Sequence, residues 1–90
     1  MNASEILRQL ALMQDKLEGW GIKPNGFPTK KHPQDSEQAL AYLLHIMSRC
    51  RGMVVKGDLT GAIEKIGFMR GVIWATCFAT LAELRQWRKQ

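Results

Sequence analysis

The spacing of apolar residues is the feature that most constrains the fold, because apolar residues recur with the period of a helix in every segment where their spacing is regular. In the first 20 residues, apolar side chains recur at alternating intervals of three and four, which places them along one side of a helix. These positions are Ala3, Ile6, Leu10, Met13, Leu17 and Trp20. The intervening Arg8 and Gln9 are expected on the solvent side. No segment shows the two-residue alternation of a strand, so the sequence predicts an all-α fold.

Capping residues place the helix boundaries. Asn2 with Glu5, and Thr80 with Glu83, have the three-residue spacing of a capping box. Gly57 can end the second helix in a left-handed turn. The prediction is a bundle of three main helices and a short C-terminal helix, over about 3–19, 36–56, 59–76 and 81–89. In the last of these, Leu81, Leu84 and Trp87 are expected to pack inward.

The segment 21–35 is predicted to be a loop. It contains three prolines and an Asn-Gly pair, and each proline disfavours helical geometry at the residue before it. Fifteen residues make a long connection for a compact domain, and such loops are often functional. Its second half is basic and includes Lys30, Lys31 and His32.

The length of the chain, 90 residues, is that of one domain, and its 46% of hydrophobic residues is enough for a core. A chain of this size buries only about 60–65% of the surface that its unfolded form exposes. A second copy would cover more, so a homodimer is an open alternative to a monomer.

The apolar stretch 67–82 is too short to cross a membrane. It contains Arg70, and only twelve uncharged residues run from Gly71 to Ala82, whereas a spanning helix needs about 20. The first 20 residues carry charges throughout and do not resemble a signal peptide. We therefore expect a cytoplasmic protein. Cys50 and Cys77 are then expected to be buried, reduced thiols, with a disulfide between their helices as the alternative.

Small residues recur every four positions in the third helix, at Gly67, Gly71 and Ala75, beside Trp74. Glycine inside a helix costs about 1 kcal/mol relative to alanine, so two glycines one turn apart need a reason. The favoured interpretation is close packing of this face on the second helix, and the alternative is a self-association face. Arg70 is expected to extend its charged end outward.

No catalytic or metal-binding pattern is found. His32 and His45 have no cysteine, histidine or carboxylate at the spacing of zinc ligands. His45 and Cys50 are five positions apart and would point in different directions on a helix. The glycines do not follow a strand, as a phosphate-binding loop requires. We predict a protein that is not an enzyme, with no metal and no cofactor.

The net charge of +5 favours acidic partners but is spread along the chain. It amounts to −1 for residues 1–20 and +2 for each of 21–35, 36–57 and 58–90. The predicted partner-binding surface joins the basic part of the loop to the end of the last helix, where basic groups surround one aromatic residue. Its residues are Lys30, Lys31, His32, Arg85, Trp87, Arg88 and Lys89.

The stretch "IEKIGFMRGVIWATCFATLAELRQWRK" resembles a group of small phage and prophage proteins. The matching positions are Gly67, Phe68, Met69, Gly71, Val72, Ile73, Trp74, Thr80, Glu83 and Leu84. Arg70 stands where that group more often has glutamine, and Cys77-Phe78 at the corner is a further departure. The resemblance covers about the last third of the chain and implies a helical fold in a phage setting.

Taken with the absence of catalytic patterns, the resemblance implies a small phage protein that binds a bacterial host protein or complex. Its effect would be to modulate or inhibit that partner, for example a host-defence system. The first alternative is a small basic protein that binds DNA or RNA, since direct phosphate contact is the other common use of positive charge. The second is a helical dimerisation or scaffold module.

Overall fold

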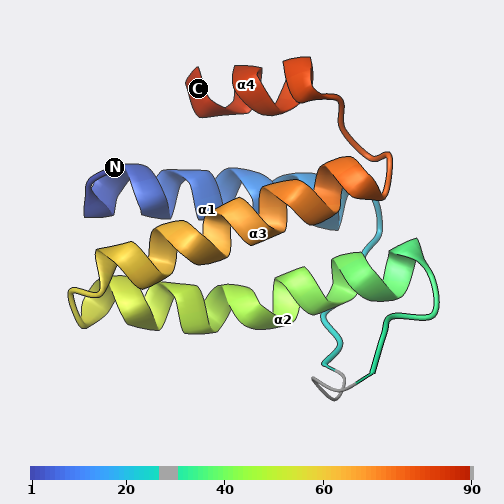
Figure 1. Ribbon diagram of the computed structural model, residues 1–90, viewed down its shortest axis with the longest axis horizontal. Coiled ribbons are helices and arrows are strands. Elements are labelled where there is room, and N and C mark those ends of the chain that lie inside the picture. The colour runs from blue at the N-terminus through green and yellow to red at the C-terminus, as the bar shows by residue number, and fades with distance from the viewer. Residues whose placement is uncertain (27–30, 90) are drawn as a thin grey trace.

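The computed structural model describes residues 1–26 and 31–89, which form four helices and no strand (Figure 1). The prediction of an all-α bundle with a short C-terminal helix is confirmed. The second and third helices each end one residue earlier than predicted. The helices are α1 (Ala3–Gly19), α2 (Ser36–Val55), α3 (Leu59–Ala75) and α4 (Leu81–Lys89).

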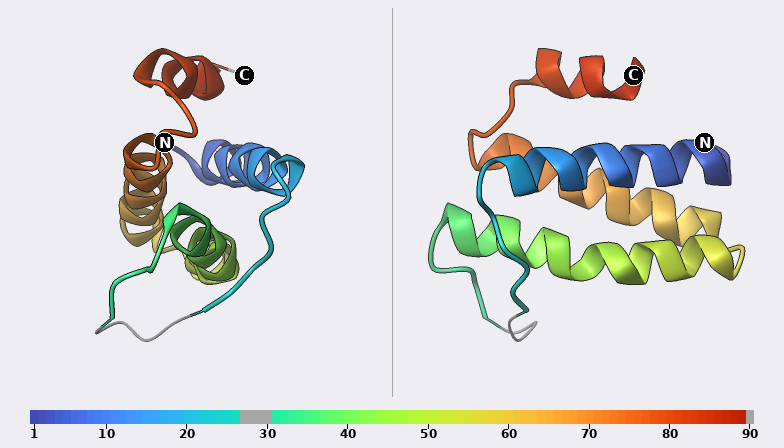
Figure 2. Two further views of the ribbon diagram at one scale, coloured as in Figure 1. Left: turned by 90° about the vertical axis from the view of Figure 1, so that its right-hand side faces the viewer. Right: turned by 180° about the vertical axis from the view of Figure 1, so that it is seen from behind.

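Helices α1, α2 and α3 lie side by side and pack against one another, and α4 covers α1 and α3 on the side away from α2 (Figures 1 and 2). The core is formed by one row of side chains from each long helix. Of the row predicted for α1, Ile6, Leu10, Met13 and Leu17 are fully buried, whereas Ala3 is half-buried and Trp20 is 37% exposed. The remaining core is contributed mainly by Leu40, Leu43, Met47 and Cys50 of α2 and by Ala62, Ile66, Met69 and Ile73 of α3.

The three long helices begin with a side-chain cap. Asn2 accepts a hydrogen bond from the Glu5 amide at 2.8 Å, and Asp35 accepts one from the Gln38 amide at 2.8 Å. Asp58 does the same for Gly61 at 3.0 Å. Each cap satisfies a first-turn amide that has no partner within the helix, which explains why the helices start at these residues.

The same three helices end in one arrangement, in which the chain turns through a left-handed residue. Gly21 ends α1 with φ of 81°, and Gly57 ends α2 with φ of 83°. At the end of α3 this position is taken by Cys77, with φ of 65°. Its amide donates to the Trp74 carbonyl at 3.0 Å and the Phe78 amide donates to the Ile73 carbonyl at 3.2 Å, the two bonds of a Schellman motif. Cys77 thus occupies a backbone conformation that favours glycine.

Replacing Cys77 with glycine is expected to stabilise the fold. The left-handed conformation destabilises a residue with a Cβ by about 1–2 kcal/mol. Glycine avoids this cost, but it also makes the unfolded chain more flexible, which cancels part of the gain in stability. We therefore expect Cys77→Gly to raise the free energy of unfolding by about 1 kcal/mol in urea denaturation. The reciprocal control is Gly57→Ala, which should lower it. A Cys77→Gly variant less stable than the wild type would contradict this account of the turn.

Candidate interaction surfaces

The predicted basic surface is not assembled. Lys31 and His32 are exposed beside α2, whereas α4 lies on the opposite side of the bundle (Figures 1 and 2). Lys30 lies outside the described residues. Arg85, Arg88 and Lys89 are exposed on α4, but the structure does not bring them near the loop. Sequence spacing could not reveal this, because the separation depends on which sides of the bundle the two segments occupy.

Trp87 is 5% exposed, so the expectation that it anchors a partner is wrong. Its ring lies 6.4 Å from that of Trp20, which in turn is 4.9 Å from the ring of Phe78. The Lys16 Nζ atom lies 5.7 Å from the centre of the Trp87 ring. These contacts join the end of α1, the corner after α3 and α4. Trp87 therefore attaches the last helix to the bundle.

The small residues of α3 do not pack on α2. Gly67, Gly71, Trp74 and Ala75 are all exposed, and a Cβ added at either glycine would meet nothing within 4 Å. The expectation of close packing against the second helix is therefore wrong. Helix α3 is apolar on most sides, and the row that takes the core is Ala62, Ile66, Met69 and Ile73.

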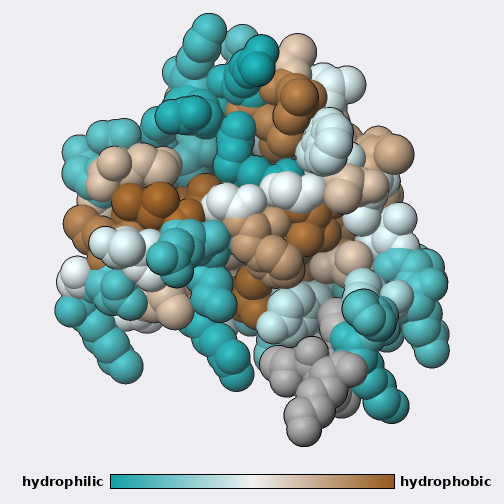
Figure 3. All heavy atoms as spheres, viewed as in Figure 1, coloured by the Kyte–Doolittle hydropathy of each residue, from teal (hydrophilic) through white to brown (hydrophobic). Residues whose placement is uncertain are grey.

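The outward face of α3 forms a largely apolar strip, interrupted by the exposed Glu64, that continues onto the start of α4. We define the α3 strip as Ile63, Gly67, Phe68, Gly71, Trp74 and Leu81. Its four large side chains are 39% exposed at Ile63, 49% at Phe68, and 52% at both Trp74 and Leu81. Leu81 was expected to pack inward and does not. Figure 3 shows apolar and neutral atoms crossing the middle of this face, with hydrophilic side chains above and below.

A hollow of about 440 Å³ lies at the α4 end of the strip, between Trp74 and Leu81. Thr80 and Glu83 line its far side and hold each other in the predicted capping box, with both bonds between 3.1 and 3.2 Å. The hollow therefore has an apolar side that continues the strip and a rigid polar side. It can admit a side chain of a molecule that rests on α3.

A smaller cavity of about 200 Å³ lies where α1, α3 and α4 meet. Gln9 was expected to face solvent, but its side chain is 1% exposed and lines this cavity. Its Nε2 atom donates to the Trp87 carbonyl at 3.0 Å, whereas Oε1 has no partner. A buried acceptor without a donor costs about 1–3 kcal/mol. Gln9 lies three residues after Ile6 and four before Met13, a spacing that could have placed it on the buried side.

Arg70 lines the same cavity and is half-buried, so it extends toward α4 rather than freely into solvent. Its Nη2 atom donates to the Leu84 carbonyl at 3.0 Å, and its Nη1 atom is buried without a partner. Burial lowers the pKa of Arg70 below its usual value, and the positive charge of Arg88 lowers it further. Arg88 also lines the cavity, so a positively charged residue borders it from each of two neighbouring helices.

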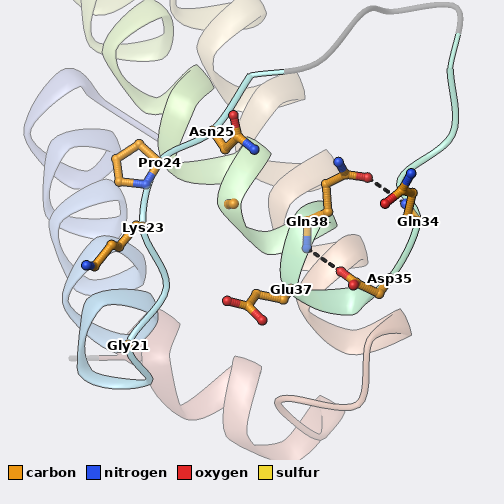
Figure 4. A pocket seen from close by; sticks show the side chains of 9 residues that line it. Gly21, Lys23, Pro24, Asn25, Gln34, Asp35, Glu37 and Gln38 are labelled. Carbon is orange, nitrogen blue, oxygen red and sulfur yellow. Dashed lines mark hydrogen bonds between the residues drawn. The ribbon is translucent and has the colours of Figure 1, made fainter.

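A hollow of about 580 Å³ lies between the segment after α1 and the start of α2 (Figure 4). Some of its polar groups are engaged with one another. The Gln34 amide donates to Gln38 Oε1 at 2.6 Å, and the Gln38 amide donates to Asp35 (Figure 4). These bonds engage Gln38 and Asp35, and the exposed Lys23 and Glu37 also line the hollow.

Within residues 1–26 and 31–89, no group of three or more histidine, cysteine or acidic side chains could hold a metal ion. The helices of this part of the chain also include none that is long and apolar enough to span a membrane. Comparison of the chain with protein-family models, curated proteins and solved structures gave no match. The phage resemblance of the last third therefore remains a prediction.

The two cysteines are free, and only one is buried as expected. Cys77 is exposed, whereas Cys50 is fully buried and its Sγ atom lies 3.5 Å from the Ala62 carbonyl. Burial raises the pKa of the Cys50 thiol, against the opposing effect of the positive charges of Arg51 and Lys65. Burial therefore disfavours the thiolate form of Cys50 and shields its sulfur, whereas the Cys77 side chain is exposed.

Thiol labelling under native conditions should consequently modify one cysteine per chain. We expect Ellman's reagent to react quickly with Cys77 and to reach Cys50 only when the protein unfolds. The Cys77→Ser variant should then react slowly, and the Cys50→Ala variant should keep the fast phase. Fast labelling of two thiols in the wild type would contradict the packing of α2 against α3.

Alanine at the two strip glycines is expected to stabilise the protein. A Cβ at Gly67 or Gly71 enters open space, so only the helix propensity changes. Each substitution should raise the free energy of unfolding by about 1 kcal/mol in urea denaturation. A loss of stability would mean that a neighbouring element touches this face of α3.

Proposed function

We propose that this chain is a protein-binding module without enzymatic activity, which presents the α3 strip to an apolar helix of a partner protein. The observation that supports this is the outward position of Gly67 and Gly71. Each costs about 1 kcal/mol in a helix interior, and nothing in the described fold uses the space they leave. Small residues one turn apart let the backbone of another helix approach closely, so an external helix suits this face.

The large side chains of the strip suit the same occupant. Ile63 and Trp74 stand on either side of the glycines along α3, and Phe68 lies beside them. A helix laid along this face would cover all three and leave the glycines at the point of closest approach. Aromatic residues that become buried in this way usually carry much of the binding energy. The hollow between Trp74 and Leu81 can take one further side chain of the partner.

Charge favours a partner with acidic residues beside its apolar ones. The chain has a net charge of +5, and Arg70 and Arg88 line the same cavity as Ile63 and Gly67. Neither arginine has an ion pair with a carboxylate of the described residues. An acidic partner would supply the missing charges, whereas a second copy of this chain would bring more positive charge.

The resemblance of the last third to phage and prophage proteins suggests where such a partner is found. In that setting the partner is a bacterial host protein or complex, for example part of a defence system. The module would act by covering a surface that the host protein needs. Inhibition by occupancy requires no chemistry beyond binding, which agrees with the absence of any catalytic pattern in the sequence.

The proposal is tested by filling the glycine strip. Gly71→Leu places a bulky side chain where the partner helix would approach, and the monomer has room for it. Gly52→Leu is the matched control, because a Cβ at Gly52 of α2 also meets nothing within 4 Å and lies outside the strip. Proteins retained from bacterial lysate by tagged wild type would be purified and titrated against all three forms.

We expect a partner whose affinity is lowered at least about 100-fold by Gly71→Leu, since loss of a close helix contact costs several kcal/mol. Gly52→Leu should leave binding unchanged, and added salt should weaken it by screening the arginines. Equal loss in both variants, or none in either, would refute the role of the strip.

Two other results would assign a different function. Concentration-dependent dimers in sedimentation that Gly71→Leu abolishes would make a second copy the occupant of the strip. Affinity for DNA of arbitrary sequence that falls steeply with salt, and that Gly71→Leu leaves unchanged, would favour the nucleic-acid alternative.

A further inference from the structure

The cavity at the junction of α1, α3 and α4 contains an acceptor in a fixed position that lacks a donor. The amide of Gln9 is held by its Nε2 atom, which donates to the Trp87 carbonyl near the end of α4. This bond fixes the orientation of the amide and leaves Oε1 as its free end, covered by the residues around the cavity. Since the side chain is 1% exposed, bulk water does not satisfy this acceptor.

The same cavity contains an excess of positive charge. Arg70 approaches from α3 and Arg88 from α4, and no carboxylate of the described residues pairs with either. Arg70 uses Nη2 to hold the Leu84 carbonyl but has no partner for the buried Nη1. Two guanidinium groups without a counterion favour an oxyanion, to which each can donate more than one hydrogen bond.

Together these groups define the chemistry of a ligand. The oxyanion accepts hydrogen bonds from the arginines, and it also has to donate a hydrogen bond to Gln9 Oε1. A carboxylate or sulfate has no proton to donate at neutral pH, whereas a phosphate group with one proton has both functions. We propose that this cavity binds a singly protonated phosphate group, either free hydrogen phosphate or a phosphomonoester.

Entry of the ligand requires a small movement of side chains. The atoms Gln9 Oε1 and Arg70 Nη1 are covered by their surroundings. Arg88 is exposed and Arg70 only half-buried, so these two side chains can move apart to admit the anion. Gln9, held by the Trp87 carbonyl, stays in place. The site therefore combines a fixed acceptor with adjustable donors, and it does not depend on the proposed protein partner.

The test is a titration with phosphate and sulfate, which have the same shape and differ in the proton. Titrations followed by the side-chain resonances of Gln9 and Arg70 would be done at about pH 8 for inorganic phosphate, which then carries one proton and the same charge as sulfate, and at about pH 6 for a phosphomonoester, which is then about half singly protonated. We expect phosphate to shift both resonances and to bind about tenfold more tightly than sulfate, because only phosphate satisfies Oε1. Equal affinities for the two anions, or no shift with either, would overturn the proposal.

A matched pair of variants separates the cavity from general attraction to a basic surface. Arg88→Gln removes a cavity charge, and Arg85→Gln makes the same change at an exposed position of α4 that does not line the cavity. Phosphate affinity should fall about tenfold in Arg88→Gln and less than about twofold in Arg85→Gln. Equal losses would mean non-specific binding and would overturn the proposal.

A third titration with glycerol 3-phosphate distinguishes the two sources of the phosphate group. Tighter binding than that of inorganic phosphate would identify phosphomonoesters as the ligand class. Binding of inorganic phosphate alone would identify the free ion. Because the measurement needs no protein partner, its failure would leave the proposal for the α3 strip untouched.

Discussion

The burial of one side of α3 determines most of what this protein presents to its surroundings. Ala62, Ile66, Met69 and Ile73 enter the core, and the helical repeat then turns Gly67 and Gly71 outward. Arg70 follows Met69 and falls at the border between these two sides. Its stem lies against the bundle while its guanidinium group reaches α4. The α3 strip and the arginine-lined cavity therefore both follow from which side of α3 is buried in the core.

Helix α4 depends on this arrangement more than the other helices do. It has nine residues, too few to be stable alone, so its position comes from contacts with the bundle. Gln9 and Arg8 donate to the carbonyls of Trp87 and Arg88, groups that have no partner within the last turn of a helix. These polar contacts, with the burial of Leu84 and Trp87, hold α4 across α1 and α3. Of the residues that fix α4, Gln9 and Arg88 also line the cavity.

The local features of the fold could be predicted from sequence because they depend on neighbours along the chain. The spacing of apolar residues gave α1 its buried row, and Asn2 and Thr80 placed helix starts correctly. The orientation of α3 could not be predicted, because its sequence is apolar on most sides and only the packing partners choose among them. The predicted basic surface, which joined the loop to α4, was wrong for a related reason. It depended on where two segments distant in sequence lie relative to each other in the bundle.

The polar residues of the cavity show a further limit of sequence reasoning. Gln9 has the spacing of a core position, but its polarity assigned it to solvent. Its burial makes sense only once α4 supplies the Trp87 carbonyl, 78 positions away, as acceptor. Most side-chain hydrogen bonds in proteins go to the backbone or to water, and composition and periodicity do not show which distant carbonyl comes within reach.

The strip and the cavity are physically continuous, because Ile63 and Gly67 border the cavity and also belong to the strip. An anion bound between Arg70 and Arg88 would cancel the positive charge at that edge of the strip. A partner that relies on acidic residues at this edge would then bind less tightly, and by reciprocity its binding would weaken that of the anion. A partner held only by apolar contacts with Trp74 and Leu81, at the other end of the strip, would not be affected. The two proposed sites are thus coupled through the charge of two arginines, although each can exist without the other.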